Sequence, residues 1–387
     1  MSVCITGLGV VSAAGMNVAD TISFIKKGIR PSQGNKPFKT EFDYPIFSVN
    51  SLPLNENVDL NRTNKLLELA LNEALIDSGL SSEALKSNRI GVVIGTTISC
   101  QLNDIDFYSK LKSSDSLDHK SVLKYFSNNP SEFVKNKLNA KGPFVTVTNA
   151  CSSSTDALGI GFEWIEAGFC DIVIAGGADE LNLVPYAGFR SLSVVSSDYC
   201  KPFDKFRNGL NLGEGAGVLI LENEYFARKR GLDKPLKMYA YSSFADAYHL
   251  TAPKPEGSEL ARCIKDLLLK ASIKERDISF INAHGTATKD NDKVEGRVFK
   301  NIFGERIPFY SSKGVTGHTL GAAGAIEAVF CCINLTDGWI PPSVGFSDFD
   351  EEIGIAPVSR VTQIEKKYAI STSLAFGGNN SALLIGF

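Results

Sequence analysis

The sequence lacks the features that mark nucleic-acid-binding, membrane and secreted proteins. Its formal net charge is only −3, so the chain as a whole does not attract nucleic acid or an anionic membrane. It contains no block of like charges, and its apolar runs stop short of the roughly 20 residues that a membrane span needs. The first residues, MSVCITGLGVVSAAG, contain no basic leader, so we expect no signal peptide. These absences predict a cytoplasmic protein with no nucleic-acid or membrane partner.

Cysteine and histidine are few and scattered. The eight cysteines form no C-x-x-C pair and no regular spacing, which argues against a disulfide framework or a zinc site and fits a reducing compartment. We therefore expect no metal ion. Histidine occurs only at His119, His249, His284 and His318. What is present, 43% hydrophobic and 21% charged residues, suits a folded protein with a large core.

Apolar strands and amphipathic helices alternate along the first part of the chain. Gly7 and Gly9 follow a strand but lack the third glycine and the acidic residue of a dinucleotide-binding fingerprint, so NAD is not expected. A long polar segment, 99–141, interrupts the pattern and is expected to cover a site or an interface. Strands are predicted at 3–11, 89–96, 171–177 and 213–221, and helices at 17–28 and 62–79.

The same pattern restarts near residue 230. NACSSSTDALGIGFEWI and GHTLGAAGAIEAVFCCINL share one layout, a small-residue turn followed by an amphipathic helix. We infer an internal duplication with halves at 1–229 and 230–387, and an α/β fold with a buried, largely parallel sheet. The later strands are predicted at 236–242, 278–283, 308–311, 368–373 and 381–387, and the later helices at 258–271, 293–302 and 322–335.

Three reactive side chains lie where strands end and helices begin. Cys151 follows an apolar run, 145–148, that suits a buried strand, and a thiol at the N-terminus of the next helix is favoured as a thiolate. His284 directly follows a strand, and His318 directly precedes a helix. In isolation each would be read as a structural residue, Cys151 as a small buried hydrophobe. Ligands bind at such corners of α/β sheets, so the three side chains together predict a site.

Four stretches, NACSSSTDA, NAHGTAT, SSKGVTGHTLGAAGAIEA and LAFGGNNSA, occur in an order and spacing that resemble the β-ketoacyl-acyl-carrier-protein synthases. The chain is most similar to the decarboxylating Cys-His-His type, in its long-chain branch or a secondary-pathway relative. The resemblance implies a thiolase fold, with five layers α-β-α-β-α built from two similar halves. It also implies an acyltransferase of fatty-acid, polyketide or polyene elongation, usually a homodimer. Its substrates would be carried on the phosphopantetheine of acyl carrier protein, with no other cofactor.

The resemblance also implies roles for individual residues. Cys151 would carry the acyl group, and His284 and His318 would donate to the enolate left when malonyl thioester loses CO2. The N–H groups of Cys151 and Phe376 would hold the tetrahedral oxyanion. Lys313, paired with Glu327, would keep the histidines neutral. The residues expected to contact substrate are Thr286, Thr288, Gly377, Gly378 and, in a mobile loop, Asp246.

Some positions depart from the common pattern of the family. Ser154, Ala375 and Asn379 replace residues more usual near the acyl gate, so the accepted chain length stays open. Because acyl carrier proteins are strongly acidic, a basic rim is expected around the site. Its candidate residues are Arg62, Lys65, Lys201, Lys205 and Arg207.

Two other functions remain open from the sequence. The chain could be the chain-length-determining, catalytically silent subunit of a heterodimer with a related synthase, although the retained Cys151, His284, His318 and Lys313 argue against that. It could instead be a thioester hydrolase on the same fold, for which a base near the cysteine and a water path would be needed. A thiolase is disfavoured, because the C-terminal turn reads AFGGNN and contains no second cysteine.

Overall fold

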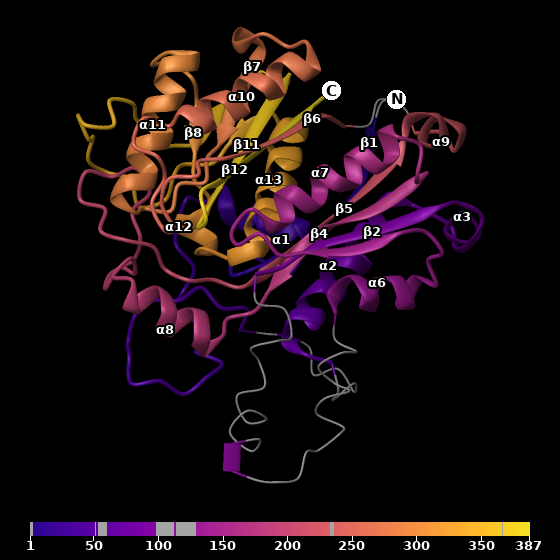
Figure 1. Ribbon diagram of the computed structural model, residues 1–387, viewed down its shortest axis with the longest axis horizontal. Coiled ribbons are helices and arrows are strands. Elements are labelled where there is room, and N and C mark those ends of the chain that lie inside the picture. Colours follow the sequence, from indigo (N-terminus) through magenta and orange to yellow (C-terminus); the bar gives the residue numbers. More distant parts are fainter. Residues whose placement is uncertain are drawn as a thin grey trace.

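Ten strands form one sheet in the computed structural model of this chain (Figure 1), in the order β3-β2-β4-β5-β1-β6-β12-β11-β7-β8. The structure describes residues 3–50, 52, 60–97, 112–113, 129–232, 236–365 and 367–387. The strands are β1 (Val3–Ser12), β2 (Ile90–Gly95), β3 (Phe144–Val147), β4 (Ile172–Asp179), β5 (Gly215–Asn223), β6 (Lys237–Ala245), β7 (Ile278–Asn282), β8 (Phe309–Tyr310), β11 (Tyr368–Ala375) and β12 (Asn379–Gly386).

The sheet contains the same strand order twice. Numbered within its own half, each set runs first, fifth, fourth, second, third: β1-β5-β4-β2-β3 and β6-β12-β11-β7-β8. The pairing directions also match, because the first two pairs of each set are antiparallel and the last two are parallel. The two sets join where β1 pairs with β6 at Val3 and Cys4. The fold therefore consists of two similar halves, while the boundary between residues 229 and 230 stays a prediction.

Helices cover both faces of each half. They are α1 (Val18–Ile25), α2 (Arg62–Ser78), α3 (Ser82–Ser87), α6 (Pro130–Leu138), α7 (Ser153–Glu166), α8 (Leu183–Ser191), α9 (Glu224–Lys229), α10 (Ser258–Ala271), α11 (Lys289–Phe303), α12 (Lys313–Thr316) and α13 (Ala323–Asp337). Helix α2 packs on β1 and β5, and α10 packs on β6 and β12. Helices α7 and α13 contact each other and strands of both halves, so they form the central layer.

Side-chain alternation along the strands shows this layering. On β4, Ile172 and Ile174 pack in one core with α2, whereas Val173 and Ala175 pack in the core that contains α7 and α13. A strand with two buried faces lies between two helical layers, because successive side chains point to opposite faces. The same alternation in β12 places Leu383 toward the central helices and Leu384 toward α10. The five layers are therefore α-β-α-β-α, as the resemblance implied.

One stretch, Leu320–Asp337, is long and apolar enough by composition to cross a membrane, but 89% of it is buried inside the protein. It contains α13, whose residues from Ala323 to Leu335 are all buried. The apolar character of this stretch is accounted for by its position between the two halves of the sheet.

Most predicted elements are present, and α10 has the predicted ends. Two expectations were wrong. The sheet is mixed rather than largely parallel, because the first and last strands of each half pair antiparallel. Strand β3 is an edge strand with Phe144 42% and Val145 37% exposed, so its β-branched run does not indicate burial. Helix α6 lies inside the polar segment 99–141. Most of that segment, with His119 and the site or interface it was expected to cover, lies outside the described residues.

Candidate active site

Cys151 lies on a strained turn between β3 and α7. The preceding residue, Ala150, has φ 47°, a left-handed conformation that costs a non-glycine residue about 1 kcal/mol or more. Gly95 on β2 lets the turn pack closely, because a Cβ there would lie 2.4 Å from the Ser153 carbonyl carbon. The sulfur is thereby presented at the start of α7, which begins at Ser153.

The environment of the thiol differs from the sequence expectation. Cys151 is only 4% exposed, and this burial raises the pKa of its thiol to about 11. The backbone N–H groups of Phe376 and Cys151 itself, together with the ammonium of Lys313, act in the opposite direction. The N-terminus of α7 does not by itself make Cys151 a thiolate. The hydrogen-bond donors near the sulfur must therefore stabilise the negative charge when the thiolate forms.

His318 places a further donor beside the sulfur. Its Nε2 lies 3.1 Å from Cys151 Sγ, and its Nδ1 accepts the N–H of Leu320 at 3.2 Å. A neutral imidazole that accepts at Nδ1 carries its proton on Nε2, so His318 presents an N–H to the sulfur. Burial and Lys313 hold the pKa of His318 well below its usual range. Because Leu320 belongs to the turn before α13, this local backbone determines the tautomer.

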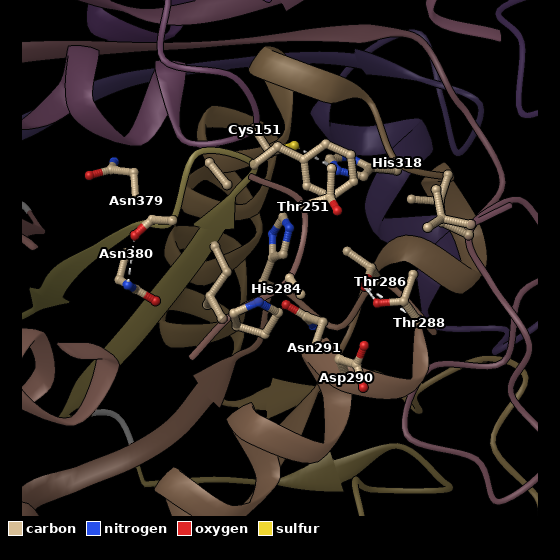
Figure 2. A pocket seen from close by; sticks show the side chains of 18 of the residues that line it. Cys151, Thr251, His284, Thr286, Thr288, Asp290, Asn291, His318, Asn379 and Asn380 are labelled. Atoms are coloured by element: carbon tan, nitrogen blue, oxygen red, sulfur yellow. Dashed lines mark hydrogen bonds between the residues drawn. The ribbon is translucent and has the colours of Figure 1, made fainter. Parts of the chain in front are cut away.

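His284, two residues after the end of β7, faces the same point (Figure 2). Its ring centroid lies 5.2 Å from that of His318, with the ring planes at 85°. Lys313 Nζ lies 3.2 Å from His284 Nδ1, and an ammonium can only donate, so His284 also carries its proton on Nε2. Burial, with Lys313 and His318, lowers the pKa of His284 well below its usual range. Both imidazoles are therefore neutral donors.

Lys313 and Glu327 form a buried ion pair behind His284, with Nζ 2.5 Å from Oε1. Each side chain is only 2% exposed. Lys313 Nζ also donates to the His284 carbonyl oxygen at 2.5 Å. Burial raises the pKa of Glu327 to about 7, and the ammonium opposes that shift. The expected pairing of these two residues is thus present in the geometry.

Two buried carboxylates that the sequence analysis missed support the histidines. Glu295 of α11 accepts the backbone N–H groups of His284 and Gly285, at 2.9 and 2.7 Å. Asp179, at the end of β4, accepts the N–H of Gly321 at 2.7 Å, next to the His318 turn. The sequence pattern around Glu295 is the same as that around Glu327: each is an acidic residue on the apolar face of a helix. Asp179 is an acidic residue at the end of an all-apolar strand.

The cysteine and the two histidines line a pocket (Figure 2). Of the predicted substrate contacts, Thr286, Thr288, Asp246 and Gly378 also line it. Gly377 is not among the lining residues, and its N–H donates to Leu250 O in the 246–253 loop. The remaining wall includes Phe189, Val194, Leu210, Thr251, Ala252, Pro253, Asp290, Asn291, Leu374, Ala375, Phe376, Asn379 and Asn380.

The polar residues of this pocket are engaged with one another. The Thr286 and Thr288 hydroxyls lie 2.8 Å apart, at the side of the pocket opposite Cys151 in Figure 2. Asp246 accepts Asn380 Nδ2 at 2.9 Å and the N–H of Lys254 at 2.9 Å. Asp246 therefore ties its loop to β12. Ser154, expected near the acyl gate, instead accepts the N–H of Ala325 and joins α7 to α13.

The expectation of a basic rim was wrong for two of its candidate residues. The guanidinium of Arg62 donates to Glu214, which is fully buried, at 2.5 and 2.8 Å. Arg207 is itself buried and pairs with Asp350. Both are used to join segments of this chain, so neither is a free charge for a carrier protein. Lys205, in contrast, is exposed.

The sulfur and the two imidazoles lie within 4.8 Å of one another, close enough to act on a single thioester carbonyl. The same atoms are a donor set that could hold a soft metal ion. The ammonium of Lys313 beside His284 opposes a cation at this point, because like charges repel. The arrangement instead favours anionic oxygen or sulfur, which the two imidazole N–H groups, the backbone N–H groups of Phe376 and Cys151, and a buried cation would stabilise.

Comparison with known proteins agrees with this geometry. Residues 32–227 match the family described as "Beta-ketoacyl synthase, N-terminal domain", and residues 237–347 match "Beta-ketoacyl synthase, C-terminal domain". The chain is 30% identical over 413 residues to the tetracenomycin polyketide synthase ketoacyl synthase alpha subunit of Streptomyces glaucescens, covering 99% of this chain and 96% of that protein. It is 30% identical over 414 residues to 3-oxoacyl-[acyl-carrier-protein] synthase 2 of Staphylococcus aureus, covering 99% and 97%. A chain of the solved structure "Ketosynthase (ApeO) in Complex with its Chain Length Factor (ApeC) from Xenorhabdus doucetiae" is 33% identical with a TM-score of 0.85, covering 100% of this chain and 98% of that chain.

Proposed function

Because the chain belongs to the β-ketoacyl synthase family, we propose that it joins an acyl group to a two-carbon unit from malonyl-acyl carrier protein, giving 3-oxoacyl-acyl carrier protein. The observation that carries this proposal is that one thiol and two imidazoles lie within 4.8 Å of one another. Cys151 Sγ lies 3.1 Å from His318 Nε2, and the His284 ring lies beside that of His318. A cysteine hydrolase needs a histidine that accepts a proton, whereas both imidazoles here are held as N–H donors.

In the first step the Cys151 sulfur attacks the carbonyl carbon of the acyl thioester. The N–H groups of Cys151 and Phe376 face this sulfur and would stabilise the tetrahedral oxyanion. The intermediate collapses with loss of the phosphopantetheine thiolate, which takes up the proton lost from Cys151. The acyl group is then a thioester on Cys151, and the carrier leaves with a free thiol.

In the second step malonyl thioester loses CO2. The electron pair of the broken C–C bond becomes an enolate, whose oxygen would accept from His284 Nε2–H and His318 Nε2–H. A preorganised donor of this kind is worth about 3 kcal/mol or more in the transition state. The enolate carbon attacks the acyl-Cys151 carbonyl, and collapse of that intermediate expels the Cys151 thiolate, which takes up one proton. The product is 3-oxoacyl-acyl carrier protein, two carbons longer.

Thr286 and Thr288 support the binding of the phosphopantetheine arm. Both residues line the pocket, and their hydroxyls lie 2.8 Å apart. The chemistry uses thiol, imidazole and backbone donors only, so we propose that no further cofactor takes part. Carrier-bound substrates fit a role in the cytoplasm.

For partners, we propose acyl carrier protein and a second synthase-like chain, either another copy or a related subunit. The similar structure from Xenorhabdus doucetiae is a complex of a ketosynthase with its chain length factor. The exposed edge strand β3, with Phe144 and Val145 on its surface, could pair with a second chain, because edge strands leave backbone groups unpaired. The cysteine, both histidines and Lys313 are all in place, which makes this chain the catalytic member of a pair.

A turnover assay tests the proposal. The protein is mixed with acyl carrier proteins bearing acyl chains of graded length and with malonyl-acyl carrier protein, and the products are followed by mass spectrometry together with CO2 release. We expect a 3-oxoacyl product two carbons longer, absent for Cys151→Ala. Free fatty acid without elongation would support the hydrolase. No turnover with any chain, alone or with a related subunit added, would contradict the proposal.

A further inference from the structure

One buried carboxylate, Asp156, links the Cys151 turn to the other half of the protein. It lies in the first turn of α7 and is 5% exposed. From its own half it accepts Asn149 Nδ2 at 2.7 Å and Ser152 Oγ at 2.9 Å. From the other half it accepts Tyr241 Oη at 2.8 Å, Asn379 Nδ2 at 3.3 Å and the hydroxyl of Ser381.

These five donors are all neutral, so the network is not an ion pair. A buried carboxylate is costly unless hydrogen bonds and dipoles replace its hydration. The position of Asp156 in the first turn of α7 adds the favourable end of the helix dipole. Each of the donors is therefore held firmly, because a donor that moves away leaves charge unsatisfied.

The most informative donor is Asn379, because it belongs to the turn that carries Phe376. Asn379 pairs with Ala375 across the β11–β12 hairpin, so only Phe376, Gly377 and Gly378 lie between them. Its Nδ2 also donates to Ser152 Oγ at 2.8 Å, the residue directly after the nucleophile. Asn379 thus bonds both to Asp156 and to the residue next to Cys151.

The hairpin turn is held by two sets of contacts: backbone hydrogen bonds of Gly377 and Gly378 to the 246–253 loop, and the hydrogen bonds of Asn379 to Ser152 and Asp156. The second set links the turn to the segment that carries Cys151. Gly377 and Gly378 have φ of 91° and 84°, and such glycines allow a turn many conformations. The N–H of Phe376 hydrogen-bonds the Cys151 sulfur, and acyl transfer needs this N–H to stay beside the sulfur, where the oxyanion forms on the attacked carbonyl. A displacement of about 1 Å at such a donor can cost roughly 100-fold in rate, so the anchor at Asn379 matters for the chemistry.

We propose that Asp156 is a positioning residue for acyl transfer, which holds the Phe376 N–H against the Cys151 sulfur through Ser152 and Asn379. The inference rests on the proposed function, because the oxyanion role of that N–H belongs to it. Malonyl decarboxylation relies on His284 and His318, whose supports are Glu295, Lys313 and the Leu320 turn. Asp156 is therefore required for one partial reaction and not for the other.

The test measures the two partial reactions separately. Acylation of Cys151 by acyl-acyl carrier protein is timed by quenched intact-mass measurements, and decarboxylation is timed by CO2 release from malonyl-acyl carrier protein alone. Asp156→Asn, which is isosteric, and Asn379→Ala should each slow acylation by about 10-fold or more and leave decarboxylation within about twofold. The double variant should be no slower than the slower single variant, because both changes break one connection.

Tyr241→Phe is the matched control. It removes a donor from β6 to Asp156 Oδ1, whereas Asn379 bonds the other carboxylate oxygen, Oδ2. We expect a lower melting temperature and acylation within about twofold of the parent. Equal loss of both partial reactions in the Asp156 and Asn379 variants would show a merely structural role and overturn the inference, as would unchanged acylation. If the unmodified protein performs neither reaction, the proposed function fails instead.

Discussion

Lys313 Nζ lies 2.5 Å from Glu327 Oε1 and 3.2 Å from His284 Nδ1. One buried cation therefore has two consequences. It neutralises a carboxylate in the protein interior, and it requires His284 to carry its proton on Nε2, toward the thiol. The charge of Lys313 and the function of His284 are coupled through this single contact, and the coupling can be tested by substitution.

Replacing Lys313 with methionine should affect both stability and decarboxylation. The change leaves Glu327 buried without its partner, which typically costs roughly 3–5 kcal/mol. The double variant Lys313→Met/Glu327→Leu should recover much of that stability but not the decarboxylation rate. Thermal unfolding and CO2 release measure the two effects. A Lys313→Met protein as stable as the parent would contradict the buried ion pair.

His284→Ala should separate the two steps of the reaction. His284 has no contact with Cys151 that matches the 3.1 Å contact of His318, so acylation should proceed within a few-fold of the parent rate. Loss of one enolate donor should slow decarboxylation by about 100-fold or more. The acylation rate is measured by intact mass, and the decarboxylation rate is measured by CO2 release. Parallel loss of both activities would mean that His284 serves the acyl-transfer step as well.

The pH dependence of Cys151 alkylation should reflect its burial. Because its pKa is raised to about 11, the thiolate fraction rises with pH throughout the neutral and mildly alkaline range. The iodoacetamide rate at the Cys151 peptide should therefore increase about tenfold per pH unit between about pH 7 and pH 9, whereas an ordinary thiol levels off near about 8.5. The unfolded protein provides that reference. A plateau below about pH 8 would show that the nearby donors outweigh burial.

Decarboxylation should tolerate mild acid. The pKa values of His284 and His318 are both lowered well below 6.5, so their neutral N–H forms persist as pH falls through that value. The CO2 release rate should show no loss centred near about pH 6.5, the pKa of an ordinary histidine. A half-maximal rate at that pH would indicate that at least one imidazole titrates normally.

Two glycines offer a matched pair of substitutions. A Cβ at Gly95 would lie 2.4 Å from backbone atoms of Ser153 and Ser154, so Gly95→Ala should displace the Cys151 turn and sharply reduce acylation. Gly188 is in α8, and a Cβ there meets nothing within 4 Å. Gly188→Ala should keep activity and stabilise the protein by up to about 1 kcal/mol. Activity in Gly95→Ala equal to that of Gly188→Ala would contradict the close packing at the turn.

Much of the fold could be predicted because local pattern and tertiary structure agree. Helix α10 has buried positions at helical spacing and ends where the pattern ends. Strand direction could not be predicted in this way, since antiparallel strands such as β5 are buried on both faces and read like parallel ones. The burial of β3 was predicted wrongly for a related reason. Its β-branched residues favour any strand, including an exposed edge strand.

The site residues that lie in family motifs could be predicted from the sequence. The residues from distant segments that hydrogen-bond to them could not. Cys151, His284, His318 and the Lys313–Glu327 pair come together as expected. Glu295 and Asp179 act through backbone N–H groups, which no motif displays. Arg62 and Arg207 appeared as free charges because their partners, Glu214 and Asp350, are 152 and 143 residues away in the chain.

The most direct test of the central claim is the covalent intermediate itself. The intact mass of the protein is measured after mixing with acyl-acyl carrier protein, and again after a chase with malonyl-acyl carrier protein. We predict a mass increase equal to the acyl group, located on Cys151 and absent in Cys151→Ala. The chase should remove it with release of CO2 and appearance of a carrier-bound chain two carbons longer. The account would be contradicted if no adduct formed with any chain length. It would also be contradicted if the adduct disappeared no faster with malonyl-acyl carrier protein than without it.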